Sequence, residues 1–543
     1  MAHTRSTDVL VVGAGPVGLT AAVELRRRGV SCRIVDRLPA RLPFAKAVGI
    51  QPRTLELWDR MGLIRAAMEA AVPIRGQLAY ANGVELPRLD FVLPPEVPYG
   101  FAALPQYETE RILDEFLARF GTAVERGTEL VSFAQDADGV TGRLLTPSGA
   151  EEEVRARFLV GCDGAHSIVR KGLGLSYEGG AFPEEYMLAD VEVDWDLPHG
   201  YAVRSMHRDA AGAVDDVLVC IPLPGAGRYR ASMLVPPELS TAQQADAVSD
   251  GVAHGLQTGR APALPDIQTV LDRLSPQPAT ASNIRWASVF RISHRIVDRY
   301  ADGRVFVAGD AAHIHPPTGA QGMNTGIQDA WNLAWKLALA VDGRAHPGLL
   351  RTYDTERRPV GEEVVGRTVR HAEAGVQADP DDPGTVMLRE AQLLVAYRGS
   401  PIVGPPGEGP GPRPGDRAPD CGGLTAPIAA HPLRLHDLLR DRGHVLLVYG
   451  DDPRTGELAR TARESSAGRM EACAILGPDA PADTTGLPEY RDTDGAFARR
   501  YAVDGPTAFV IRPDGHLSAR LSPPDPAALA AHLATTFAPG TEP

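Results

Sequence analysis

Two glycine-rich segments, far apart in the chain, carry residue types suited to binding phosphate and sugar groups. The first is Gly13-Ala-Gly15-Pro16-Val-Gly18, which follows an apolar run and precedes a helix-compatible stretch. Glycines at these positions permit a tight turn, let the backbone approach a diphosphate and allow close contact between helix and strand. A helix that begins here presents N–H groups and the positive end of its dipole to an anion. The segment predicts dinucleotide binding, and alone it fits FAD and NAD equally.

An acidic residue stands where the same motif requires one. Asp36 closes a second apolar run that begins at Cys32, and its carboxylate can accept hydrogen bonds from the ribose hydroxyls of an adenosine. Arg37 follows directly. Asp36 and Arg37 are therefore predicted to bind the cofactor together with the first glycine-rich segment.

The second glycine-rich segment offers a carboxylate and another helix start. Gly309-Asp310 ends an apolar run and leads into a loop with the candidate catalytic residues Pro317, Gly322, Met323 and Asn324. Asp310 can accept hydrogen bonds from a chain of hydroxyl groups, and a helix that begins at 322–324 can stabilise a group that gains negative charge. An ordinary strand–loop–helix connection is the alternative interpretation.

A third segment places Asp163-Gly164 after the apolar run 158–161, with Arg170 shortly beyond. By itself an Asp-Gly pair is usually a turn. Its position between the two glycine-rich segments is what makes it a candidate for cofactor binding.

The elements that must position these residues follow from hydrophobic patterning. Residues 8–12 and 32–36 are short β-branched runs on either side of a helical stretch at 16–28, which predicts a βαβ unit. The middle of the chain instead has strand-like runs separated by turns, which favours an antiparallel sheet covered by helices. Further on, patterning predicts one more strand and two long helices. The predicted middle strands are 186–195, 217–223 and 229–235, their covering helices 242–256 and 267–274, the later strand 304–308, and the long helices 323–341 and 349–374.

In this order, the three motifs resemble those of group A flavoprotein monooxygenases, the aromatic hydroxylases of the para-hydroxybenzoate and phenol hydroxylase type. The resemblance implies non-covalently bound FAD, with NADPH or NADH as co-substrate. It places Asp310 at the ribitol and the loop 317–324 against the isoalloxazine, where N–H groups stabilise negative charge on the reduced flavin. It also assigns Asp163, Gly164 and Arg170 to FAD and NAD(P)H together, and Lys46 and Gln106 to FAD.

The resemblance implies that the chain uses O₂ and NAD(P)H to hydroxylate an aromatic or polycyclic phenolic substrate through a flavin C4a-hydroperoxide. A role in tailoring natural products such as antibiotics is a further expectation. Baeyer–Villiger or epoxidising chemistry on the same scaffold remains open, because the fold does not decide between them. A flavin-binding protein without turnover is the alternative from another class, and the intact loop 317–324 argues against it.

The chain departs from phenol hydroxylase at one position. Phenol hydroxylase carries an aspartate thought to help deprotonate the phenol, where this chain has Val48. Deprotonation is therefore left to another group or to the acidity of the substrate.

The domain organisation follows from the motifs and from shifts in composition. We expect a discontinuous Rossmann-like FAD-binding domain of α/β class (1–74, 100–175 and 285–400) and an inserted antiparallel-sheet substrate domain (75–99 and 176–284). The Pro- and Gly-rich stretch 401–417 is typical of a linker. The remainder, 418–543, resembles the thioredoxin-like domain of the phenol hydroxylase branch but has no CxxC pair.

Bulk properties exclude several classes of partner. Acidic residues exceed basic ones by 14, which argues against nucleic acid and anionic membranes. No apolar signal segment or membrane-length apolar run is present, so a cytoplasmic protein is expected. The five scattered cysteines predict reduced thiols and no metal site. The sequence leaves a homodimer open.

Two residue pairs carry a functional and a structural interpretation. His313 and His315 could bind a metal or act as a base, but without a third ligand at a metal spacing a hydrogen-bonded structural histidine is favoured. Trp331 and Trp335, spaced i and i+4 on a predicted helix, are expected to pack in the core and not to stack on substrate.

Overall fold

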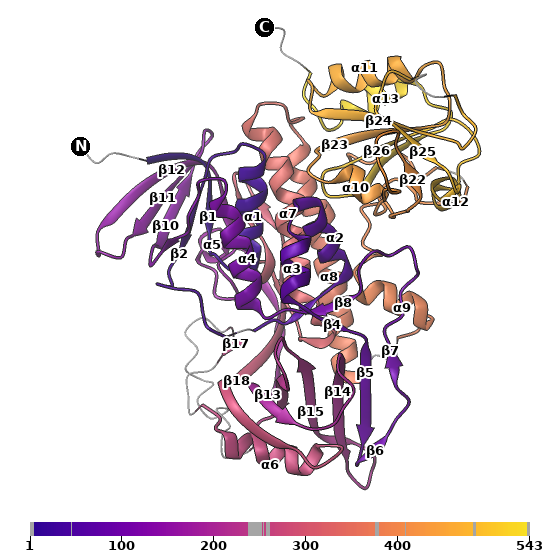
Figure 1. The fold of residues 1–543 in the computed structure, drawn as a ribbon. Helices are drawn as coiled ribbons and strands as arrows, with labels where there is room; N and C mark the ends of the chain where they lie inside the picture. The colour runs from indigo at the N-terminus through magenta and orange to yellow at the C-terminus, as the bar shows by residue number, and fades with distance from the viewer. Residues whose placement is uncertain are drawn as a thin grey trace.

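The computed structural model describes residues 5–44, 46–236, 252, 255–256, 261–374, 379–407, 409–481 and 485–539. Figure 1 shows three units: a central α/β unit, an antiparallel sheet at the lower end, and a C-terminal unit beside the long helices. The predicted Rossmann-like α/β unit and antiparallel sheet are confirmed. Most of the helix predicted at 242–256 lies outside the described residues, and its last two residues form a short strand, β17 (Gly255–Leu256).

The sheet of the central unit brings four strand ends into one row. Its three central strands are parallel to one another and to β20, and Val12, Val35, Gly161 and Val307 lie side by side at their carboxyl ends. In parallel sheets ligands bind outside this edge. The sheet contains β10 (Glu129–Gln135), β11 (Val140–Leu145), β12 (Glu151–Gly161), β1 (Arg5–Val12), β2 (Cys32–Asp36) and β9 (Glu125–Arg126), with β20 (Val305–Val307) and β19 (Ala301–Asp302) beside β12.

Helices cover this sheet and form the core with it. Helix α1 is buried from Gly18 to Leu25, and α7 is buried from Asn324 to Leu337, because each helix packs on the sheet and on other helices. A small three-stranded sheet lies beside them. The helices are α1 (Pro16–Arg27), α2 (Pro52–Met61), α3 (Ile64–Ala70), α4 (Gln106–Ala118), α5 (Ile168–Gly172), α7 (Gly322–Val341), α8 (Thr352–Ala374) and α9 (Pro383–Glu390), and the small sheet is β3 (Gly49–Ile50), β8 (Phe101–Ala103) and β4 (Val72–Ile74).

The antiparallel sheet has two unlike faces. On one face Met187, Ala231 and Met233 pack against helix α6 (Leu264–Leu274). Alternate residues on the same strands point to the other face, because side chains alternate along a strand. Its strands, in spatial order after β17, are β18 (Thr280–Val297), β13 (Tyr177–Asp194), β16 (Arg228–Leu234), β15 (Val214–Pro222), β14 (Tyr201–Arg208), β5 (Gly76–Ala81) and β6 (Val84–Glu85), with β7 (Leu89–Asp90) and β21 (His313–Ile314) at its edges.

One expected domain boundary falls within a continuous strand. Residues 285–297, assigned from sequence to the FAD-binding domain, belong to β18 and pair with β13 as far as Val297. A single long strand crosses from one unit to the other, so the motif-based boundary falls inside it. The domain division remains a proposal.

The C-terminal unit is built on its own mixed sheet. Central β23 is parallel to β24 and antiparallel to β26, and residues 400–407 and 409–417 contain no helix or strand. The thioredoxin-like classification remains a prediction. The strands are β22 (Leu424–Thr425), β25 (Glu489–Asp492), β24 (Met470–Leu476), β23 (His444–Tyr449), β26 (Thr507–Ile511) and β27 (Leu517–Leu521), and the helices α10 (Leu435–Leu439), α11 (Thr455–Ser465), α12 (Ala496–Tyr501) and α13 (Pro526–Leu533). Among the described residues, no helix has the length and apolar character needed to cross a membrane.

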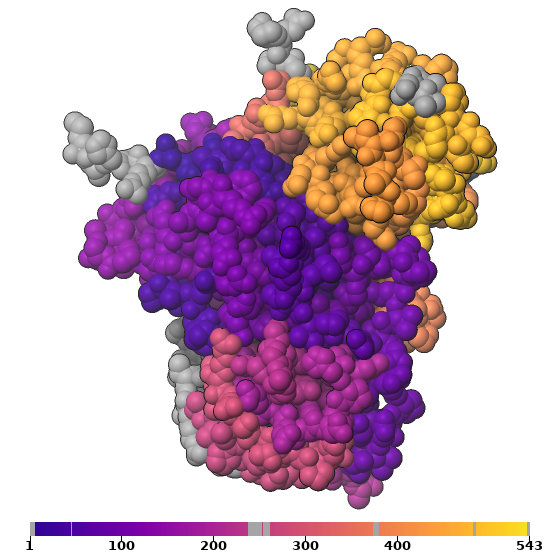
Figure 2. Space-filling model, viewed as in Figure 1, coloured from indigo at the N-terminus to yellow at the C-terminus, as the bar shows by residue number. Residues whose placement is uncertain are grey.

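A buried cluster of charges joins the C-terminal unit to the central one. Arg512 donates to both carboxylate oxygens of Glu356 on α8, at 2.7 and 2.8 Å, and Lys336 on α7 donates to the same carboxylate at 2.7 Å. Trp331 and Trp335 lie here, donating to Pro513 O and to the Asp514 carboxylate, so their predicted core role is confirmed. Figure 2 shows the orange and yellow C-terminal residues seated against the central unit.

This cluster makes stability depend on pH. Burial raises the pKa of the Glu356 carboxyl, but Arg512 and Lys336 outweigh burial and hold it at about 2, below its ordinary 4.5. A depressed folded-state pKa contributes stability above the unfolded value, and this contribution is lost as pH falls from about 4.5 towards 2. Glu356→Gln should therefore destabilise the protein by about 3–5 kcal/mol near neutral pH, and the deficit should shrink below pH 4.5 in thermal unfolding curves.

The matched control is Glu362→Gln on the same helix. Glu362 is 62% exposed in its pair with Arg358 and should change stability by less than about 1 kcal/mol. A deficit for Glu356→Gln that stays constant down to pH 3 would contradict the assigned role.

Candidate functional site

A cavity of about 450 Å³ lies between the carboxyl edge of the parallel sheet and the inner face of the antiparallel sheet. It collects residues from all three sequence motifs. Of the predicted site residues, its walls include Gly13, Gly15, Pro16, Asp36, Arg37, Lys46, Gln106, Asp163, Gly164, Asp310, Pro317, Gly322 and Met323. Gly18, Arg170, Gly309 and Asn324 do not line it.

The first glycine segment has the geometry that a diphosphate requires. Gly13 has φ +96°, and a Cβ there would overlap the carbonyl of Cys162 at the end of β12. A Cβ on Gly18 would overlap Gly13 O, which accounts for glycine where α1 crosses β1. Gly15 differs, because a Cβ there would meet no atom within 4 Å and would stand in the cavity. This open position, at the N-terminus of α1, is where a phosphate can approach the backbone.

Asp36 holds this loop in place. Its carboxylate accepts a hydrogen bond from Ala14 N at 2.7 Å and another from Leu38 N at 2.8 Å. A carboxylate has about four acceptor sites, so capacity for sugar hydroxyls remains. The same side chain thus shapes the glycine loop and faces the cavity.

The Asp163 carboxylate, predicted to bind the cofactor, forms hydrogen bonds within its own segment. It accepts hydrogen bonds from Ser167 Oγ at 2.6 Å and Ile168 N at 2.8 Å, and so caps α5. Gly164 lines the cavity, has φ +79° and has open space where a Cβ would be. Arg170 is buried away from the cavity, with its guanidinium 3.9 Å from the centre of the Tyr177 ring. The roles of Asp163 and Arg170 towards FAD and nicotinamide remain predictions.

Asp310 presents an unused carboxylate to the cavity. This carboxylate has no hydrogen bond to another described side chain. The backbone carbonyl of Asp310 accepts a hydrogen bond from the Tyr177 hydroxyl at 2.9 Å. The preceding Gly309 has φ +60° and packs against Val17 of α1, so a side chain there would push the two segments apart. Gly309 is therefore a packing residue that lets Asp310 reach the cavity.

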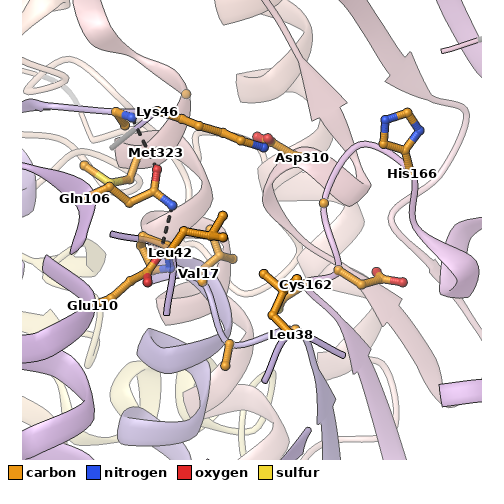
Figure 3. A pocket seen from close by; sticks show the side chains of 18 of the residues that line it. Val17, Leu38, Leu42, Lys46, Gln106, Glu110, Cys162, His166, Asp310 and Met323 are labelled. Atoms are coloured by element: carbon orange, nitrogen blue, oxygen red, sulfur yellow. Dashed lines mark hydrogen bonds between the residues drawn. The ribbon is translucent and has the colours of Figure 1, made fainter. Parts of the chain in front are cut away.

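Gln106 lies across the cavity from Asp310, and the Lys46 side chain extends between them towards Asp310 (Figure 3). Figure 3 shows Gln106 and Glu110 on one side of the cavity, with Asp310 and His166 on the other. Gln106 donates to Glu110 at 2.9 Å and accepts from Ala47 N at 3.2 Å, so it fixes the segment that carries Lys46. Burial raises the pKa of the Glu110 carboxyl, and the hydrogen bond from Gln106 partly offsets this rise.

The four residues predicted at the start of α7 and in the loop before it differ in how they meet the cavity. Pro317, Gly322 and Met323 line the cavity, whereas Asn324 is fully buried behind them. Asn324 accepts from Gln51 N at 3.0 Å and donates to Ala320 O at 2.8 Å. It therefore ties the loop to neighbouring segments and does not face the cavity, because the helical turn points its side chain inward.

The antiparallel sheet supplies a mostly apolar wall with one cation. Tyr186, Leu188, Ile221, Phe290 and Ile292 line this part with Ser232 and Arg230. Sequence reasoning missed Arg230, although its position was detectable: Tyr229 and Ala231 face α6, so Arg230 must point to the opposite face.

Arg230 is 3% exposed and incompletely bonded. Its Nε donates to Asp190 Oδ1 at 2.6 Å on the adjacent strand, and Nη1 lies 3.4 Å from Lys46 O. Its Nη2 and the second oxygen of Asp190 have no hydrogen-bond partner among the described residues. A buried donor without a partner costs about 1–3 kcal/mol, and Arg230 lines the cavity, so its guanidinium is a candidate to bind a ligand oxygen.

His313 has the structural role that the sequence favours. It is 1% exposed, and its Nε2 lies 2.7 Å from Asp329 Oδ2 on α7. Burial raises the pKa of Asp329, but Arg357 and His313 outweigh burial and lower it. His315 lines the cavity beside the loop that begins at Pro316.

The residues present fit the FAD that the motifs imply. Open glycine positions at the start of α1, the carboxylate of Asp310 and the start of α7 all line the one cavity. These groups match, in order, a diphosphate, a polyol chain and a ring system that gains negative charge.

Comparison with known proteins agrees with this geometry. The family described as FAD binding domain matches residues 6–368. The chain is 35% identical to 6-methylpretetramide 4-monooxygenase from Streptomyces rimosus, over 94% of this chain and 90% of that protein. It is 31% identical to pentachlorophenol 4-monooxygenase from Sphingobium chlorophenolicum, over 95% and 94% respectively. A solved structure of aklavinone-11 hydroxylase with FAD and aklavinone is similar with a TM-score of 0.77 and 27% identity, covering 98% of this chain and 99% of that one.

Gly15→Val tests the predicted diphosphate position. Gly15 has φ −76°, which any residue adopts, so the protein should fold normally while the added side chain occupies the cavity. We expect FAD affinity, measured by fluorescence titration, to fall at least about tenfold, or about 1.4 kcal/mol. Gly456→Val on α11 is the control, because a Cβ there also meets nothing within 4 Å but lies outside the cavity. Wild-type affinity in Gly15→Val would refute the placement.

Proposed function

The chain belongs to the FAD binding domain family that includes the aromatic flavin monooxygenases, and from this premise we propose that it hydroxylates a polycyclic phenolic compound with O₂ and NAD(P)H. The observation that carries the proposal is the continuity of one cavity from the FAD-binding motifs onto the inner face of the antiparallel sheet. A substrate on that face lies directly beside the start of α7. Relatives named for tetracycline-type substrates and pentachlorophenol support an aromatic substrate.

The lining residues favour a flat, mainly apolar substrate with an acidic oxygen. Leu188, Phe290 and Ile292 offer apolar and aromatic surface, and Arg230 Nη2 offers one unpaired donor. Val48 stands where phenol hydroxylase has an aspartate, and it packs with Leu223. We therefore assign stabilisation of the phenolate to Arg230, since a nearby cation lowers the pKa of a phenol.

The chain itself binds, orients and excludes water. When bound, FAD supplies the electron storage and oxygen activation that side chains lack. The N-terminus of α7 places the positive end of its helix dipole beside the proposed position of the flavin ring. The cavity walls from both sheets shield the reacting region from solvent. Arg230 holds the phenolic oxygen, which fixes the ring carbon presented for oxygen transfer.

Two finer expectations belong with this proposal. A cytoplasmic location and a homodimer are both consistent with the sequence, and each needs its own measurement. Light scattering of the purified protein gives the oligomeric state directly.

The reaction is tested with labelled oxygen. The holoenzyme is supplied with NADPH or NADH and a panel of polycyclic phenols under ¹⁸O₂, and NAD(P)H oxidation and product mass are followed. We expect substrate-stimulated oxidation and a hydroxylated product with one labelled oxygen. Ester or epoxide products would favour the alternative chemistry, and the absence of stimulation by every phenol would contradict the proposal.

Arg230→Lys tests the phenolate contact. It keeps the charge beside Asp190 but removes the unpaired Nη2 donor. A hydrogen bond to a charged group contributes about 1.5–3 kcal/mol, so KM for the phenol should rise about 10-fold or more. KM for the methyl ether of the same compound should change little, and FAD affinity should be unchanged. Equal losses for phenol and ether would contradict the role of Arg230.

A further inference from the structure

The turn before α7 has its carbonyl groups directed away from the cavity. Gly319 O accepts from Gln51 Nε2 at 2.6 Å and from Gln321 Nε2 at 2.9 Å. Ala320 O accepts from Asn324 Nδ2 at 2.8 Å. Both residues have left-handed backbone conformations, with φ of +70° and +55°, and for Ala320 this conformation is strained. Buried side-chain amides therefore hold a turn that the backbone alone disfavours.

The next carbonyl is fixed in the same way. Gln321 O accepts from Thr325 N at 2.9 Å and Thr325 Oγ1 at 3.0 Å, and Gln392 Nε2 lies within 3.3 Å. In a planar trans peptide the N–H points opposite to the preceding C=O. Anchoring the carbonyls of Ala320 and Gln321 thus directs the N–H groups of Gln321 and Gly322 to the other side, where both residues line the cavity.

Gln392 is the part of this arrangement that comes from outside the FAD motifs. It follows α9 and lies beyond residues 6–368, which match the family. It is 3% exposed and has φ +59°, an unfavourable conformation for a residue that is not glycine. A strained backbone conformation of this kind persists only where surrounding contacts hold the residue in place, and Gln392 has such contacts.

The Gln392 side chain forms hydrogen bonds with three residues. Its Nε2 donates to Gln321 Oε1 at 2.8 Å and to Thr325 Oγ1 at 3.0 Å, besides Gln321 O. Its Oε1 accepts from Gln328 Nε2 at 2.5 Å on the next turn of α7. Neighbouring Glu390 also accepts from Gln321 Nε2 at 3.0 Å. The segment 390–392 therefore hydrogen-bonds to both the backbone and the side chain of Gln321, the last residue before α7.

We propose that Gln392 is a positioning residue that aims the first N–H groups of α7 at the flavin ring and thereby stabilises the reduced cofactor over the oxidised one. The inference rests on the proposed placement of the ring against Gly322 and Met323. Gln392 acts through Gln321 and touches neither cofactor nor substrate.

The test is the reduction potential of FAD bound to two variants of the full chain. Gln392→Gly removes the amide and relaxes the backbone, since glycine accepts positive φ. Gln392→Met removes the same hydrogen bonds but keeps the length and the strain. In both, reduced FAD should bind about tenfold more weakly relative to oxidised FAD, which shifts the two-electron potential by about 30 mV to more negative values. Affinity for oxidised FAD should stay near the wild-type value.

Leu393→Ala is the control for general loosening of this segment. Leu393 is buried beside Gln392, but its apolar side chain cannot hydrogen-bond to the turn, so the potential should not move. An unchanged potential in both Gln392 variants overturns the proposal, as does a shift in only one of them or an equal shift in Leu393→Ala. Failure of the wild-type chain to bind FAD would instead refute the cofactor assignment.

Discussion

The alignment of four strand ends in one parallel sheet is the constraint on which the site depends. Val12, Val35, Gly161 and Val307 lie in register, so the loops that follow β1, β2, β12 and β20 must open on the same edge. Those loops carry Gly13, Gly15, Asp163 and Asp310, and Asp36 is the last residue of β2. Backbone hydrogen bonds between the strands thus bring residues that are distant in sequence to one cavity. Helices α1 and α7 also begin there, with the positive ends of their dipoles towards the cavity.

Close packing then fixes how each group is presented. Glycines at 13, 18 and 309 allow backbone contacts that any side chain would block. Behind the cavity wall, buried amides from Gln51, Asn324 and Gln392 hold the turn before α7. The C-terminal unit contacts the same helix, α7, through Trp331 and Trp335, and it contacts α8 through the Glu356–Arg512 pair. The helix start is therefore supported from several directions, which is what a precisely placed row of N–H groups requires.

Local patterns in the sequence predict much of this fold, and they fail where distant segments meet. Cys32–Asp36 is predicted to the residue, and α7 begins one residue before its predicted start. Glycine spacing also predicts the tight contacts at Gly13 and Gly18. The inward turn of Asn324, the strand β18 that crosses between units, and the partnership of Gln392 with Gln321 depend on tertiary contacts that no local pattern encodes. Arg230 lies between these cases, because strand alternation gives its face but not its pairing with Asp190.

The central claim is that one cavity orders the groups for diphosphate, polyol and ring along a single path. A crystal structure of the chain with FAD tests it most directly. The account predicts the diphosphate against Gly15 at the start of α1, the ribitol beside Asp310, and the isoalloxazine against Gly322 and Met323, with the inner face of the antiparallel sheet left open for substrate. A flavin ring bound away from the start of α7, or a diphosphate away from Gly15, would contradict it.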